Sequence, residues 1–313
     1  MKCAIKLLLA FLLLQGCGGK PSKPVSTPTS GVAVAYFDET IKPVLEQEVA
    51  VFHSIYPDAA IHARYVSETD ALNALLKDSA QVVVVSRDLK SSEIKFLNQK
   101  QLYPRSSKIA VDAVALIVNK SNTDSLISMR SLKRILQGDI SSWNALNGAS
   151  QLGTIKVVFD NRNSSTVRLL LDSLCRGKKL SSNLSSLYSN EEVIAYVTSH
   201  SNALGIVGVS WVANKHDSLS LSFLEKVRVV GVSKEDIPSP SNAFLPFQAY
   251  LATRQYPLAR QIYSITVDPS CGLPTGFAAF LASDRGQRII LRSGILPLTQ
   301  PLRLVQVDDG APE

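Results

Sequence analysis

Asp160-Asn161-Arg162-Asn163-Ser164-Ser165-Thr166-Val167-Arg168 is a polar stretch between two apolar segments of the chain. The run 155–159 before it predicts a buried strand, and the leucine-rich residues 167–174 predict a helix. Ser164, Ser165 and Thr166 therefore fall at a helix start, where free backbone N–H groups and hydroxyls favour an anion and Arg162 or Arg168 can add charge. The alternative is that Ser164 only caps the helix.

Strand and helix patterns alternate along the rest of the chain. Four consecutive valines, Val82 to Val85, predict a strand that is buried on both faces, as in a parallel sheet. The alternation predicts an α/β fold with mainly parallel sheets, and residues 31–307 exceed one ordinary core, which indicates two lobes. We expect helices at 40–56, 69–77, 91–101, 131–137, 190–200, 276–282 and 285–293, and strands at 60–66, 81–86, 109–119, 203–210, 227–232, 247–253 and 262–267.

The N-terminus has the features of a signal peptide. Lys2 and Lys6 precede the apolar run 7–14, which is far shorter than the roughly 20 residues that span a bilayer as a helix. Leu14-Gln15-Gly16-Cys17 resembles the lipobox of bacterial lipoproteins, so residues 1–16 are predicted to be removed and Cys17 to carry lipid. Residues 17–30 would be the lipidated cysteine and a flexible tether. An ordinary secretory peptide with an incidental cysteine is the alternative.

Composition and motifs exclude several classes of function. The formal net charge of +7 is diffuse, without a basic cluster interleaved with aromatic residues, so we do not expect a nucleic-acid partner. The four histidines lack metal-ligand spacing, and neither a G-x-S-x-G elbow nor a P-loop occurs, so we expect no metal, no cofactor and no enzyme activity. Cys175 and Cys271 remain after processing, and whether they pair is left open.

Five segments, taken in order, resemble the bacterial phosphate-binding proteins of the PstS type. The likeness covers about residues 32–305. The segments are Ser86-Arg87-Asp88-Leu89 with Glu93; Val114 to Asn119 with Asn122; Ile135-Leu136-Gln137-Gly138-Asp139-Ile140-Ser141-Ser142-Trp143; Ser164-Ser165-Thr166; and Gly286-Gln287 with Gly294-Ile295-Leu296-Pro297.

This resemblance implies the type II periplasmic binding protein fold, in which two α/β lobes with mixed, mostly parallel sheets are joined by two hinge crossovers. Residues 31–112 and 247–313 would form lobe 1, and residues 113–246 would form lobe 2. It also implies a monomeric, lipid-anchored extracytoplasmic protein that binds inorganic phosphate between its lobes and delivers it to an ABC permease in the membrane. The alternatives are a receptor for sulfate, molybdate or phosphonate, and a sensing or adhesion protein on the same fold.

The resemblance also places a ligand site at helix starts from both lobes. Its residues would be Thr40, Ser67, Arg87, Arg162, Ser164, Ser165 and Thr166. Arg87 stands where the family often has an aspartate that accepts the proton of hydrogen phosphate and thereby rejects sulfate. Asp38, Asp88 and Asp160 are the candidates to supply that carboxylate instead, and a salt bridge is the alternative role for Arg87.

Overall fold

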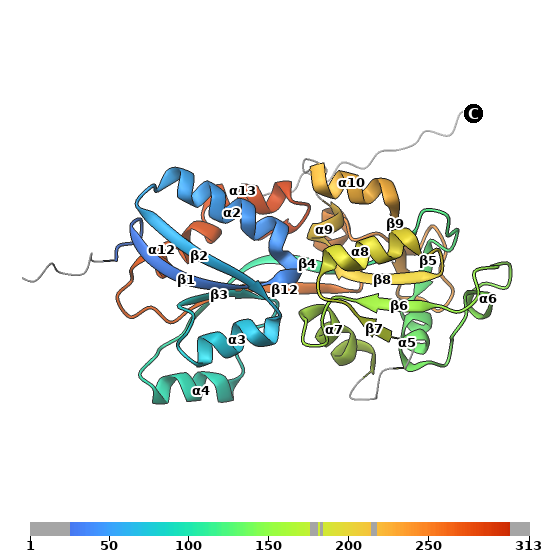
Figure 1. The fold of residues 1–313 in the computed structure, drawn as a ribbon, viewed down its shortest axis with the longest axis horizontal. Coiled ribbons are helices and arrows are strands. Elements are labelled where there is room, and N and C mark those ends of the chain that lie inside the picture. The colour runs from blue at the N-terminus through green and yellow to red at the C-terminus, as the bar shows by residue number, and fades with distance from the viewer. Residues whose placement is uncertain (1–25, 176–180, 182–183, 214–217, 301–313) are drawn as a thin grey trace, which may run out of the picture.

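The computed structural model describes residues 26–175, 181, 184–213 and 218–300. The predicted signal peptide and Cys17 lie outside the described residues. Figure 1 shows two α/β lobes joined where strands β4 (Arg105–Asn119) and β12 (Ala259–Thr266) lie between them. The predicted two-lobed α/β architecture is therefore confirmed. The exact limits of the two lobes remain a prediction.

Strand β4 connects the two lobes through hydrogen bonding. Among the described residues, ten strands form one continuous sheet. The first half of β4 pairs with β12 and β13 (Leu296–Pro297), and its second half pairs with β8 (Ala203–Gly208) and β9 (Val227–Val229). Because strands of both lobes form hydrogen bonds to β4, the positions of the two lobes are coupled through this strand.

The sheet is more antiparallel than the sequence predicted. The outer strands of lobe 1 are parallel, namely β1 (Gly31–Asp38), β2 (Ala59–Val66) and β3 (Val82–Val85). In lobe 2, β6 (Lys156–Phe159) is parallel to β7 (Leu184–Ser186) and to β8. The pairings of β4 and β12 within this sheet are antiparallel, because the chain crosses to lobe 2 along β4 and returns into β12.

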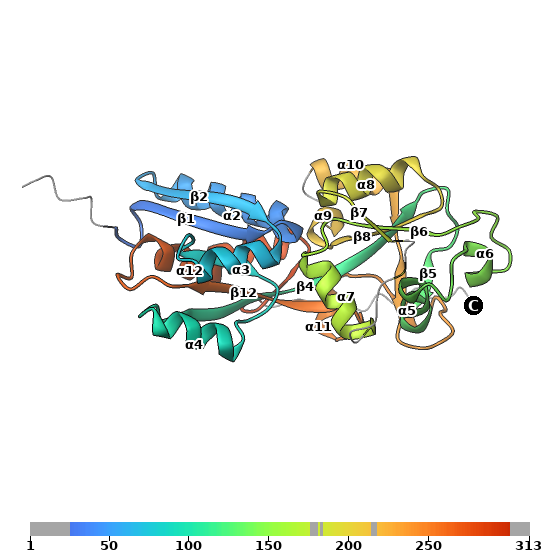
Figure 2. The same ribbon diagram turned by 60° about the horizontal axis from the view of Figure 1, so that its bottom comes forward.

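Helices cover both faces of the sheet in lobe 1. Figures 1 and 2 show α2 (Lys42–Ile55), α12 (Leu273–Ala282) and α13 (Asp284–Arg292) on one side, and α3 (Glu68–Leu76) and α4 (Ser91–Gln99) on the other. Val82 and Val84 belong to the first core, whereas Val83 and Val85 belong to the second. The prediction of a strand buried on both faces is confirmed.

Lobe 2 is built in the same way around β6 and β8. Its helical segments are α5 (Met129–Gln137), α6 (Trp143–Leu146), α7 (Ser165–Leu170), η2 (Leu171–Cys175), α8 (Asn190–Ser199), α9 (Ser210–Ala213) and α10 (Ser218–Lys226). A smaller sheet of β5 (Leu126–Ser128), β10 (Gly231–Ser233) and β11 (Ala243–Phe244) lies beside it. Helix α11 (Gln248–Ala252) begins the segment predicted to return to lobe 1.

The strand predicted at 247–253 is wrong, because this segment forms helix α11. A short apolar run cannot be assigned to a strand or a helix from its periodicity alone. Tertiary contacts favour the helix, since the Gln248 side-chain amide donates to the carbonyls of Leu291 and Ile295, at 2.7 Å each.

The predicted tether is shorter than expected at its C-terminal end. The hydroxyl of Ser26 accepts a hydrogen bond of 2.9 Å from the N–H of Leu273, at the start of α12. A Cβ atom at Gly276 would lie 1.9 Å from the carbonyl oxygen of Pro28, so this close approach requires glycine. Residues 26–30 therefore pack against lobe 1.

Cys175 and Cys271 do not form a disulfide. Both are free thiols, Cys175 buried in lobe 2 and Cys271 exposed in lobe 1. Among the described residues, every helix is too short or too polar to cross a membrane.

One buried carboxyl group in lobe 1 lies outside every polar network. Glu48 on α2 is fully buried, and neither of its carboxyl oxygens has a hydrogen-bond partner among the described residues. It borders an apolar cavity of about 20 Å³, together with Ile41, Val44, Leu45, Ile109, Ala110, Ile262, Leu281, Ile290 and Ile295. Burial raises the pKa of Glu48 to about 9, so the folded protein holds this group neutral at pH 7.

We expect Glu48→Leu to raise the melting temperature at pH 8, and to raise it less at pH 5. The pKa of Glu48 is about 9 in the folded state and 4.5 for an unperturbed glutamate, so wild-type stability falls as the pH rises between these two values. Thermal unfolding followed by circular dichroism across this range checks the prediction, with exposed Glu46→Gln as the control. An equal effect of Glu48→Leu at both pH values would contradict it.

Candidate functional site

The hydroxyl groups of the polar stretch 160–168 in lobe 2 point into the interior of the protein. Ser164 is the N-cap of α7 and accepts a hydrogen bond of 3.4 Å from the N–H of Val167. The Ser164 and Thr166 hydroxyls lie 2.8 Å apart, and Thr166 donates to Asp160 Oδ1 at 3.0 Å. The side chains are buried, so the capping role of Ser164 is confirmed and these hydroxyls also belong to a buried polar network.

Lobe 1 contributes a second helix start to the same network. Asp38 is the N-cap of η1 (Glu39–Ile41), and its Oδ1 accepts hydrogen bonds from the N–H and the hydroxyl of Thr40, at 3.0 and 2.8 Å. The hydroxyls of Thr40 and Ser165 lie 3.0 Å apart, across the boundary between the lobes. A Cβ at Gly208 would lie 2.1 Å from the Thr40 carbonyl oxygen, so glycine is needed for this approach.

A buried arginine joins the two helix starts. Arg260 on β12 donates to Ser165 Oγ at 2.5 Å and to Thr40 Oγ1 at 2.8 Å. It also donates twice to Asp112 Oδ2 on β4, at 3.0 and 2.7 Å. We call Asp38, Thr40, Ser165, Arg260 and Asp112 the interlobe cluster. It combines a cation with hydroxyls from both lobes, out of contact with water.

Several acidic groups near this cluster hold their protons more tightly than usual. Burial raises the pKa of Asp38 to about 6, although the charge of Arg260 opposes the shift. Burial and then repulsion by Asp160 raise the pKa of Glu39 to about 8. Burial also raises the pKa of Asp160. Glu39 reaches into lobe 2, where the backbone N–H and side-chain amide of Asn190 donate to its carboxylate at 3.3 and 2.5 Å.

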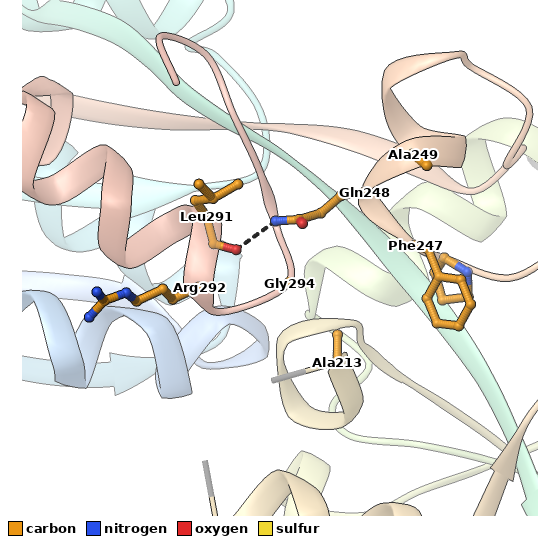
Figure 3. A pocket seen from close by; sticks show the side chains of 8 residues that line it. Ala213, Phe247, Gln248, Ala249, Leu291, Arg292 and Gly294 are labelled. Carbon is orange, nitrogen blue, oxygen red and sulfur yellow. Dashed lines mark hydrogen bonds between the residues drawn. The ribbon is translucent and has the colours of Figure 1, made fainter. Parts of the chain in front are cut away.

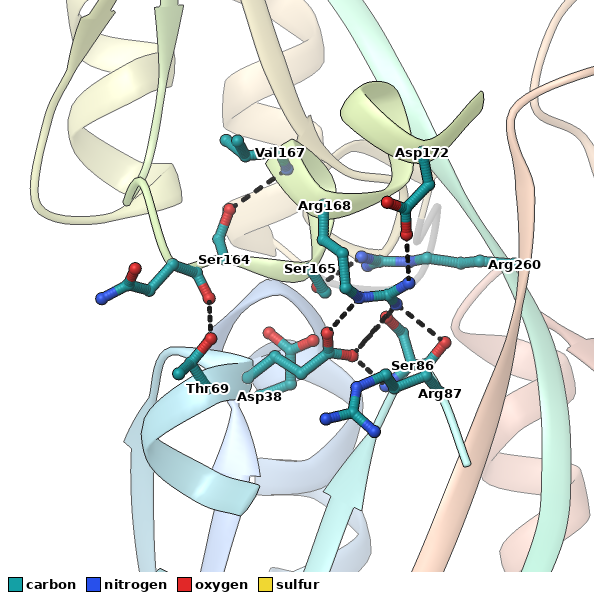
Figure 4. A network of polar contacts seen from close by, with 12 residues as sticks. Asp38, Thr69, Ser86, Arg87, Ser164, Ser165, Val167, Arg168, Asp172 and Arg260 are labelled. Atoms are coloured by element: carbon teal, nitrogen blue, oxygen red, sulfur yellow. Dashed lines mark hydrogen bonds and ion pairs between the residues drawn. The ribbon is translucent and has the colours of Figure 1, made fainter. Parts of the chain in front are cut away.

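A second set of contacts crosses between the lobes beside the cluster (Figure 4). Arg168 on α7 forms an ion pair with Glu68 on α3, and it donates to the hydroxyl of Ser86 at 3.0 Å. Glu68 also accepts from the N–H and the hydroxyl of Ser86, at 3.0 and 2.8 Å. Burial alone would raise the pKa of Glu68, but the hydrogen bonds and charge of Arg168 hold it below its ordinary value.

The remaining predicted site residues are engaged elsewhere or lie at the surface. Ser67 caps α3 and donates to Asp70 at 2.6 Å. Arg87 forms a two-pronged ion pair with Glu93, at 2.7 and 2.8 Å, which is the salt-bridge alternative left open by the sequence. Arg162 is exposed in the turn before α7. Asp88 is also exposed and accepts a hydrogen bond from the N–H of Leu89.

Sequence reasoning missed Arg260 and Asp112. Asp112 interrupts an apolar run inside the predicted strand at 109–119, and Arg260 lies just before the predicted strand at 262–267. Charged side chains are seldom fully buried without a partner, so each was a signal of a buried ion pair. The sequence did not indicate that they pair with each other.

A separate cavity of about 420 Å³ lies between α9, α11 and the end of α13 (Figure 3). Its lining is Ala213, Pro246, Phe247, Gln248, Ala249, Leu291, Arg292 and Gly294, so it shares no residue with the interlobe cluster. Figure 3 shows the Arg292 side chain pointing away from Phe247 and Gln248. The described residues of this lining therefore do not form the convergent donor set of an anion site.

Residues 23–285 match the family model described as the PBP superfamily domain. The chain belongs to the PBP superfamily. Its relatives include the phosphate-binding protein PstS of Pseudomonas aeruginosa, 22% identical over 89% of this chain and 87% of the relative. The protein of the same name from Staphylococcus aureus is 21% identical over 89% of this chain and 82% of the relative. The predicted resemblance to PstS-type proteins is confirmed by these relatives.

Solved structures show the same superfamily fold. A Clostridium perfringens structure with bound phosphate has a TM-score of 0.70 and 20% identity, over 86% of this chain and 100% of its own. An ABC-type phosphate transport receptor from Vibrio cholerae has a TM-score of 0.62 and 20% identity, with the same coverage. At this level of identity the likeness extends to the two-lobed architecture.

We expect Arg168→Gln to lower the free energy of unfolding by about 2 kcal/mol, because it leaves the buried Glu68 carboxylate without its cation. Urea denaturation measures the change. Arg288→Gln, which removes one partner of an exposed ion pair with Asp284, is the control and should shift the value by less than about 0.5 kcal/mol. Equal effects of the two substitutions would show that Arg168 contributes no more than a surface charge.

Proposed function

We propose that this chain is an extracytoplasmic solute-binding protein that captures inorganic phosphate between its lobes for an ABC importer. The observation that carries the proposal is the meeting of Thr40 and Ser165, whose hydroxyls come from helix starts of different lobes and lie 3.0 Å apart in a buried cluster. Oxyanions are bound at such sites by hydroxyl and backbone donors. The names of the curated relatives, which are phosphate-binding proteins, support phosphate as the ligand.

Binding would act by closing the lobes around the anion. The proposed ligand residues are Thr40 from lobe 1 and Ser164, Ser165 and Thr166 from lobe 2. Their hydroxyls bond to Asp38, to Asp160 and to one another in this structure, and they would turn toward the anion on binding. Contacts that a ligand makes with both lobes are complete only in the closed form, and this difference in affinity drives closure. Like its relatives, the protein is proposed to bind its ligand without chemical change.

Asp38 is the best-placed candidate to discriminate among oxyanions. Its Oδ2 is buried and has no hydrogen-bond partner among the described residues, whereas Asp88 is exposed and Asp160 already accepts from Thr166. A carboxylate can accept a hydrogen bond from hydrogen phosphate, but it repels sulfate, which has no proton to donate. The proposed filter therefore favours phosphate over sulfate.

Thermal unfolding with different oxyanions tests the proposed function. Phosphate at 100 times its Kd should stabilise the native state by about 2.7 kcal/mol. Sulfate and molybdate at matched ionic strength should stabilise it less. The double substitution Ser164→Ala with Thr166→Ala should abolish the phosphate effect, whereas Ser142→Ala, which removes the cap of α6, should keep it. Stabilisation by sulfate or molybdate alone would assign another ligand. No effect of any oxyanion would favour a sensing or adhesion role.

We also propose that Cys17 carries a lipid that anchors the protein to the membrane. Cys17→Ser should move the protein from the membrane fraction to the soluble fraction of cells, and it should abolish labelling by a radioactive fatty acid. Cys271→Ser, which changes an exposed thiol of lobe 1, is the control and should leave both unchanged. Retention of Cys17→Ser in the membrane fraction would point to an uncleaved signal peptide.

A further inference from the structure

The two strands that link the lobes carry opposite charges at matching positions. Arg260 on β12 and Asp112 on β4 are direct cross-strand partners. Both side chains are buried, with 2% and 0% of their surface exposed. Each lies in a strand where the chain passes between the lobes, so the pair is part of the connection between them.

Among the described arginines at the boundary between the lobes, Arg260 alone contacts hydroxyls of both lobes. Its Nη2 donates to Thr40 in lobe 1 and its Nη1 to Ser165 in lobe 2. Arg168 contacts Glu68 and Ser86, and Arg87 contacts Glu93. The guanidinium of Arg260 therefore lies where an anion held by Thr40 and Ser165 would need its charge partner.

The hydrogen bonds of Arg260 leave it a donor for a ligand. A guanidinium has five N–H donors, and each Nη atom carries two of them. Nε and Nη2 donate to Asp112 and Thr40, whereas Nη1 has one partner among the described residues, which is Ser165. One N–H of Nη1 therefore remains for an acceptor. Asp112, which accepts twice from Arg260, sets the orientation of this fork.

We propose that Arg260 is the charge-bearing ligand residue of the oxyanion site, held in place by Asp112 as a positioning residue. This inference rests on the proposed function and adds to it the residue that selects for a charged oxyanion. An anion bonded to Arg260 and to hydroxyls of both lobes is fixed relative to the two linking strands as well as to each lobe. Binding of the ligand would therefore act directly on β4 and β12, the strands that link the lobes.

Isothermal titration calorimetry with inorganic phosphate on the folded wild-type protein and its variants tests this inference. Arg260→Gln alone leaves Asp112 buried without its cation and can prevent folding. The double substitution Arg260→Gln with Asp112→Asn removes both charges together. It should retain the wild-type circular dichroism spectrum and lose about 100-fold in phosphate affinity, since charge-assisted hydrogen bonds to the anion are lost. Arg260→Lys, which keeps the charge but not the fork, should lose about tenfold.

The matched control removes an ion pair remote from the cluster. Arg130→Gln with Asp236→Asn should leave the affinity within twofold of wild type, because this ion pair is exposed to solvent and has no contact with the interlobe cluster among the described residues. A folded Arg260→Gln/Asp112→Asn variant with wild-type affinity would overturn the inference and leave the proposed function standing. If that variant does not fold, wild-type affinity of Arg260→Lys overturns the inference instead. A wild-type protein that binds no phosphate would overturn the proposed function itself.

Discussion

Buried charge between the two lobes is the constraint on which this structure depends. A charge removed from water needs a partner of opposite sign, and losing one partner of a buried pair destabilises a protein strongly. Arg260 and Asp112 form such an ion pair between the linking strands. Arg168 and Glu68 form another between the two lobes. Because Arg168 and Glu68 belong to different lobes, their ion pair restricts how the two lobes are placed relative to each other.

Two acidic residues of lobe 1 lie at the boundary with lobe 2. Asp38 uses the backbone and hydroxyl donors of Thr40, and Glu39 uses those of Asn190 at the start of α8. Each of these carboxyl groups accepts hydrogen bonds from N–H or hydroxyl groups of the kind that bind an oxyanion. Their raised pKa values follow from burial, so an anion entering this region meets groups that take up protons readily. Binding of the proposed anion at this boundary would therefore depend on the protonation of Asp38 and Glu39.

Local patterns in the sequence predicted much of the fold and part of the candidate site. The alternation of strands and helices, the four valines of β3 and the cap at Ser164 follow from periodicity and from the chemistry of helix starts. Ser164, Ser165 and Thr166 were identified in this way, and Thr40 through the resemblance to the PstS-type proteins. In the structure all four are buried, and the hydroxyl of Thr40 meets that of Ser165. Helix α11 was misjudged because a short apolar segment takes its conformation from its neighbours, here the carbonyls of Leu291 and Ile295.

The amino-acid sequence alone predicted the α/β class and the hydroxyls at helix starts, because both depend on residues close together in the chain, and it predicted the two lobes from the length of the chain. Tertiary structure was needed to show that Arg260 pairs with Asp112, 148 residues away, while Arg87 turns to Glu93. The choice of partner for a charged side chain depends on strand register and burial. These are properties of the packed protein, and local sequence does not encode them.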